Sequence, residues 1–235
     1  MKNKTLWKQV GAAAIAAAMV MSTVPATPVQ AAGGKTLAVS SQKQLNQALK
    51  TVKGKNAVIT VKAGKNVKIT IPKGTYKVTI RVVGKKAAVV NNGTVKEIVV
   101  NSKGTVAIKN NGTIKKVTVQ NAKSVSFSGN HKKAVPVVVN AEDVSMILAA
   151  PAKITAKKDV NIVLKKGAEK SSITCTKNVQ AQVDNQTKKA ISVKIADGTT
   201  LKVESGESCT ITPKGKKEDT SGEDKTDGKD QKTDD

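Results

Sequence analysis

Lysine occupies a recurring place in this 235-residue chain. A short repeated unit carries an anchor residue, and lysine stands two positions after six of the eight anchors, at Lys65, Lys86, Lys103, Lys123, Lys158 and Lys177. In a stacked repeat these ammonium groups would line one edge, about one strand spacing (~5 Å) apart. Exposed like charges at that distance repel by less than ~1 kcal/mol per pair, and a bound polyanion would relieve the repulsion. The spacing therefore predicts a binding edge for an anionic polymer.

The overall charge points the same way. The chain has 41 Lys and Arg against 17 Asp and Glu, a net charge of +24, and Arg81 is its only arginine. Lysine binds anions as a point charge, so we expect salt-sensitive binding of an acidic glycan, a teichoic-acid-like polymer or nucleic acid without sequence specificity. Trp7, Tyr76 and Phe127 are the only aromatic residues, too few for a base-stacking platform.

A second interpretation makes the charge incidental. Turns favour polar residues and lysine is abundant, which would leave a structural or host-interacting surface module, such as an adhesin. Salt dependence of binding separates this interpretation from a polyanion-binding edge.

Catalytic and metal chemistry lack their usual residue sets. His131 is the only histidine and no nucleophile motif accompanies it, while zinc sites need three or four ligands. We expect no catalytic residue, metal or cofactor, and we expect His131 to be an exposed loop residue. Cys175 and Cys209 fit a disulfide in a secreted chain, but Cys175 occupies an inward anchor position that equally fits a buried free thiol.

The elements that position the lysines follow from an internal repeat. NNGTVKEIVV from Asn91 and NNGTIKKVTV from Asn110 match at an offset of 19 residues. Short runs of alternating Val, Ile and Thr predict strands, and a coil of about 19 residues can bury its apolar side only by stacking on its neighbours. The pattern predicts an all-β, single-domain parallel β-solenoid of about eight coils. Its anchors are Ala63, Gly84, Asn101, Asn121, Asn140, Ala156, Cys175 and Ala196.

Three successive anchors are asparagines. Asn101, Asn121 and Asn140 could hydrogen-bond from coil to coil as an amide ladder, or they could satisfy the turns that follow them.

The ends of the chain have different compositions. Residues 1–31 have a basic start and a short apolar run from Val10 to Val20, which predicts a secretory signal peptide and an extracellular protein without a membrane span. The β-helix domain is expected over residues 32–213, with a capping helix over 41–53 that begins at a capping box. Residues 214–235 predict a disordered charged tail, either a spacer or an intramolecular competitor for the basic domain. We expect a monomer.

These features together resemble the right-handed parallel β-helix proteins of the pectate-lyase-like superfamily. The resemblance rests on the signal peptide, the cap sequence SSQKQLNQALK and Val-rich coils with an Asn column, and it covers about Ser40 to Thr212. It implies lyases, hydrolases, adhesins or non-catalytic surface proteins, and in the lyases an acidic calcium cluster with an Arg or Lys base. Glu142 and Asp143 are the only adjacent carboxylates before the tail and would point to opposite faces of a strand. The resemblance thus favours a non-catalytic member, with a polysaccharide lyase acting on acidic glycans as the alternative.

Overall fold

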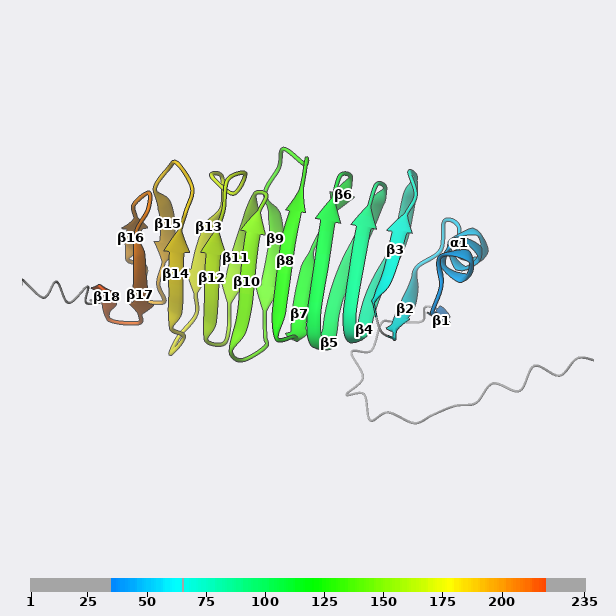
Figure 1. Ribbon diagram of the computed structural model, residues 1–235, viewed down its shortest axis with the longest axis horizontal. Coiled ribbons are helices and arrows are strands. Elements are labelled where there is room, and N and C mark those ends of the chain that lie inside the picture. Colours follow the sequence, from blue (N-terminus) through cyan, green and yellow to red (C-terminus); the bar gives the residue numbers. More distant parts are fainter. Residues whose placement is uncertain (1–34, 65, 219–235) are drawn as a thin grey trace, which may run out of the picture. The chain divides into compact units, whose positions relative to one another are not determined.

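Short strands stacked coil upon coil form the described part of the chain (Figure 1). The computed structural model describes residues 35–64 and 66–218; the predicted signal peptide, Lys65 and the chain beyond residue 218 lie outside the described residues. From the N-terminal end to residue 194, strands of successive coils pair in parallel, so that Ile80 pairs with Ile98 and Ile98 with Val117. The predicted parallel β-solenoid of about eight coils is confirmed.

Each coil contributes strands to two faces. Face A contains β1 (Lys35–Val39), β2 (Ala57–Ala63), the first parts of β4 (Thr75–Asn91) and β5 (Thr94–Asn110), β7 (Val117–Asn121), β9 (Val135–Val139), β11 (Ala152–Ala156), β13 (Ser172–Cys175) and β15 (Ile191–Lys194). Face B contains β3 (Val67–Ile71), the second parts of β4 and β5, β8 (Ser124–Gly129), β10 (Val144–Ala149), β12 (Val160–Leu164) and β14 (Ala181–Asn185). The two-residue β6 (Thr113–Ile114) pairs with the start of β5.

The core lies between the two faces, because alternate residues of every strand point inward. Stacked columns of Ile and Val fill it, and the bulkiest side chain, Phe127, lies between Ile108 and Leu148 of the neighbouring coils. These side chains are at most 1% exposed, and each contributes roughly 1.5–3 kcal/mol of burial free energy. This alternation determines which residues reach solvent.

Helix α1 (Gln42–Thr51) covers the N-terminal end of the stack, close to the predicted range. The Ser41 hydroxyl accepts a hydrogen bond from the Gln44 backbone N–H and so caps the helix. The Gln42 side chain donates to the carbonyl of Thr70 (2.8 Å) and accepts from its N–H (2.6 Å). This amide therefore satisfies part of the open edge of β3, which would otherwise be available to another strand.

The C-terminal end closes differently, by antiparallel pairing. β16 (Thr200–Val203) pairs with β15, β17 (Ser208–Thr212) with β14, and β18 (Gly215–Glu218) with β17. The prediction that disorder begins at residue 214 is therefore wrong for the first residues of the tail. Backbone pairing across a hairpin, together with an ion pair between Lys216 and Glu207, orders this polar segment without an apolar pattern.

Candidate functional site

The lysines of the solenoid gather at its two edges. The first edge carries the turns from face A to face B, and the second edge carries the turns from face B to the next strand of face A, along the upper side of the stack in Figure 1. First-edge lysines are Lys85, Lys86, Lys103, Lys123, Lys157, Lys158 and Lys177. Second-edge lysines are Lys73, Lys77, Lys96, Lys115, Lys116, Lys132, Lys133, Lys165, Lys166, Lys170, Lys188 and Lys189. Both groups are exposed.

Between the two edges, most outward side chains in the middle of face B are uncharged. One outward column runs through Ala88, Ala107, Ser126, Ile147 and Val163, which are half-buried, and it continues in register to Lys68 at one end and Asp184 at the other. Most of the described lysines thus lie at the two edges, although some strand residues, such as Lys68 and Lys153, are also exposed.

The predicted lysine column shares one edge but is not in register throughout. Lys86 pairs with Thr105, and Thr105 with Ser124, so Lys103 and Lys123 lie two and one positions earlier than the residues in that column. Turns of unequal length and the register shift between Gly84 and Lys86 cause the offset. The prediction of a single ladder is wrong for these three lysines.

The far part of the first edge mixes both charges. Lys158 and Lys177 line a hollow of about 400 Å³ together with Lys157 and the carboxylates of Glu142, Asp143 and Asp159. Lys158 Nζ lies 2.7 Å from Glu142 Oε1. The hydrogen bond and charge of Lys158 lower the pKa of Glu142, and those of Glu142 raise the pKa of Lys158. Three lysines therefore face three carboxylates, which leaves little net attraction for an anion.

Two carboxylates lie in the coil turns of the second edge, Glu97 and Glu169, and Glu204 and Glu207 lie at its C-terminal end beside Asn185 and Thr187. Glu97 pairs with Lys116 at 3.0 Å. Both carboxylate oxygens of Glu169 accept from the backbone N–H of Gly167, at 3.1 and 3.0 Å, and this bond lowers the pKa of Glu169. Among the described residues, Lys116 is the one second-edge lysine in an ion pair, while the charges of Lys166 and Lys189 also help to lower the pKa of Glu169.

His131 lies in the middle of the second edge and is half-buried. Its Nδ1 is 3.2 Å from the carbonyl oxygen of Asn110 and its Nε2 is 3.0 Å from that of Pro151, so the ring bridges the coils before and after it. The ring also meets the edge of Phe127, with centroids 5.2 Å apart. The expectation of an exposed loop residue is wrong, because these contacts fix the ring in the wall of the solenoid.

Two hollows flank His131. One of about 310 Å³ is lined by Asn110, Lys132 and Lys133 among others, and one of about 340 Å³ by Lys132, Glu169, Lys170 and Lys189 among others. Both include His131, so they are neighbours along the same edge.

The interior asparagine ladder occupies a different column from the predicted one. Asn121 and Asn140 are exposed, and Asn140 follows Val139, which pairs with Val119, so it is out of register with Asn121. Instead, Asn91 and Asn110 are fully buried, and Asn91 Nδ2 donates to Asn110 Oδ1 at 2.8 Å. The Asn-Asn-Gly of the two matching segments was the available signal for this ladder.

The two cysteines do not form a disulfide. Cys175 is a free thiol, 1% exposed, stacked on Ala156 in the preceding coil. Cys209 is buried in β17. Burial raises the pKa of Cys175 to about 11, so the reactive thiolate is scarce at neutral pH.

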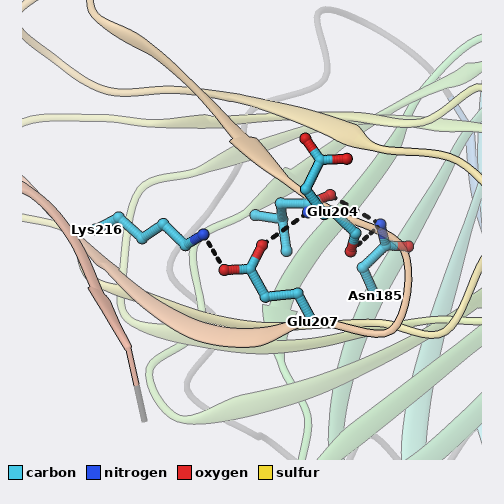
Figure 2. A network of polar contacts seen from close by, with 5 residues as sticks. Asn185, Glu204, Glu207 and Lys216 are labelled. Carbon is cyan, nitrogen blue, oxygen red and sulfur yellow. Dashed lines mark hydrogen bonds and ion pairs between the residues drawn. The ribbon is translucent and has the colours of Figure 1, made fainter.

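A third buried asparagine organises the C-terminal closure. Figure 2 shows Asn185, Glu204, Glu207 and Lys216, where Asn185 Nδ2 donates to the carbonyls of Val203 (2.9 Å) and Glu204 (3.0 Å). Glu207 accepts from the Glu204 N–H at 2.7 Å and pairs with Lys216. The groups of this network satisfy one another, which favours a structural role.

Within residues 35–64 and 66–218, no three His, Cys, Asp or Glu side chains gather as metal ligands. The helix in this part of the chain is too short and polar to cross a membrane. Comparison with protein-family models, curated proteins and solved structures finds no match.

Proposed function

We propose that this protein is a secreted, non-catalytic β-helix that binds linear polyanions along its lysine edges, at a cell surface or in the extracellular matrix. The observation that carries the proposal is the separation of charge. Lysine occupies the edges in most coils, most outward side chains in the middle of face B are uncharged, and Glu97 and Glu169 of the second edge are engaged. A polymer lying parallel to the stack would meet ammonium groups in most coils, with successive coils about 4.8 Å apart.

The second edge is the stronger candidate for this contact. The first edge, which carries the regular lysine spacing of the sequence, neutralises part of its charge with Glu142, Asp143 and Asp159. Lys86, Lys103, Lys123, Lys158 and Lys177 then supply a weaker, secondary contact. Lys65 belongs to the same proposal but lies outside the described residues.

An acidic glycan or a teichoic-acid-like polymer fits better than nucleic acid. Phe127 is buried and Tyr76 is half-buried, so neither offers an open face to a base. Given its resemblance to the pectate-lyase-like β-helix proteins, we place the protein among the non-catalytic members of that superfamily. A lyase would need convergent carboxylates for calcium, and the acids of the first edge are interleaved with lysines.

Binding to a charge-matched panel at two salt concentrations tests the proposal. Dextran sulfate, carboxymethyl dextran and lipid-free polyglycerol phosphate should bind, and unmodified dextran should not. The logarithm of affinity should fall linearly with the logarithm of salt concentration, and each lysine–anion contact should add up to ~0.9 to the slope. Absence of binding to every charged polymer at low salt would leave a structural surface module.

A further inference from the structure

We propose that the hollow between Asn110, Lys132 and Lys133 on the second edge is a pocket for one pendant tetrahedral oxyanion of the polymer, a sulfate ester or phosphate monoester. This inference rests on the proposed polyanion binding and makes it specific, because it assigns one site along the edge a chemical preference. One of the residues that line the pocket, Asn110, carries a buried amide donor without a partner.

The Asn110 side chain is fully buried, yet its Nδ2 has no hydrogen-bond acceptor in the described part of the chain. The orientation of the amide is set by its neighbours. Asn91 Nδ2 (2.8 Å) and the Gly112 N–H (3.3 Å) both donate to the other atom, which must therefore be the oxygen. A buried donor left without an acceptor costs about 1–3 kcal/mol, which a ligand oxygen would offset.

The ladder explains why this donor is left over. Asn91 Nδ2 donates to the Asn110 side chain in the next coil. The residue that pairs with Asn110 one coil later is Gly129, which offers no side-chain oxygen. A Cβ on Gly129 would lie 1.8 Å from the Asn110 carbonyl oxygen, so the close approach of the two backbones excludes any larger residue. The ladder ends at the hollow.

The rim of the hollow supplies the charge. Lys132 and Lys133 line it and are exposed, and neither forms an ion pair with any described residue. The His131 ring is engaged with carbonyls on both sides and serves as a wall. One amide and two ammonium groups are three separate donors, which matches the three terminal oxygens of a sulfate ester or phosphate monoester. A carboxylate has two oxygens, and a phosphodiester has two free ones between bulky ester links.

The decisive variant is Asn110→Asp. It keeps the acceptor oxygen used by Asn91 and Gly112 and replaces only the unpartnered amide, while adding a negative charge. Asn111→Asp is the matched control, since Asn111 is adjacent and exposed and bonds only to Asn92 through its side chain (3.0 Å). Affinities are measured for dextran sulfate, dextran phosphate and carboxymethyl dextran of equal charge density, and thermal unfolding checks that each variant folds.

We expect Asn110→Asp to weaken dextran sulfate or dextran phosphate binding by about tenfold or more, the usual effect of a hydrogen bond to a charged group, and Asn111→Asp by roughly twofold. The tighter of the two esters identifies the source of the oxyanion. Wild-type protein should bind carboxymethyl dextran less tightly than either ester. Equal losses in the two variants would overturn the pocket while polyanion binding stands, and failure of wild-type protein to bind any charged dextran would overturn both proposals.

The lysines provide an independent arm should Asn110→Asp fail to fold. The double variant Lys132→Gln/Lys133→Gln should lose the preference for the two esters over carboxymethyl dextran. The double variant Lys188→Gln/Lys189→Gln, on the same edge, should bind all three polymers more weakly and to the same extent. If both pairs reduce binding alike without changing the preference, the assigned pocket is wrong.

Discussion

The two edges of the solenoid are both rich in lysine, yet they differ in how much of that charge an external anion can use. On the first edge Glu142, Asp143 and Asp159 share a hollow with three lysines, and Glu142 is bonded to Lys158. On the second edge Glu169 is bonded to a backbone N–H and Glu97 to one lysine. The second edge has both more lysines and a more scattered set of acids, so we expect it to contribute more to the proposed polyanion binding.

The largest expected effect concerns the backbone of the two edges. Gly129→Ala on the second edge should lower the free energy of unfolding by about 3 kcal/mol or more, because φ is 139° and the new methyl would lie within 3.0 Å of three backbone atoms of Asn110. Gly104→Ala on the first edge should cost about 2 kcal/mol, since its Cβ meets Lys85 but its φ is not positive. Urea denaturation measures both; a larger loss at Gly104 would contradict the difference.

A smaller effect separates the two sets of lysines at equal charge change. Replacing Lys166, Lys170 and Lys188 by Gln should weaken dextran sulfate binding about tenfold and reduce the salt slope by up to ~0.9 for each ammonium group that no longer meets the polymer. Replacing Lys86, Lys103 and Lys123 should weaken it roughly threefold. Isothermal titration at two salt concentrations provides the comparison. Equal effects of the two triple variants would mean diffuse attraction to net charge, without a preferred edge.

The smallest effect should come from releasing a first-edge lysine. Glu142→Gln frees Lys158 and should raise affinity for dextran sulfate by about twofold at neutral pH. Lys158 lowers the pKa of Glu142. The ion pair is therefore fully formed at pH values above the ordinary carboxyl pKa, and it is lost only as the pH falls through the lowered pKa of Glu142. Wild-type affinity should therefore approach that of the variant on acidification. A constant gap between the two proteins down to strongly acidic pH would show that the pair does not limit this edge.

The period and the core of the solenoid could be predicted because they depend on strand residues alone. Ile80, Ile98 and Val117 recur about every 19 residues, and the need to bury all three side chains fixes the register of their strands. The capping helix was also predictable, since Ser41 and Gln44 have the spacing of a cap.

The second edge was missed because turns carry no such constraint. Lys132 and Lys133, Lys170, and Lys188 and Lys189 lie in turns of different length, so no fixed offset from an anchor relates them. The same variation in turn length explains the error in the first-edge column: counting from the anchors aligned Lys86 with Lys103, whereas Lys86 pairs with Thr105. Nothing in a linear count shows that Gly129 follows Asn110 in the buried column; that relation needs the register.

Because β4 and β5 pair residue by residue, the solenoid could gain or lose one whole coil at a time during evolution. Asn91 and Asn110 open nearly identical segments in neighbouring coils, so a duplication or deletion of one period would rejoin the chain at an equivalent point. Since each coil contacts its neighbours and the two ends are closed by separate devices, such an event would leave both ends intact and change the rod by one step of ~4.8 Å. Unequal recombination within the repeat could thus match the number of charged turns to the length of a polymer without redesigning the fold.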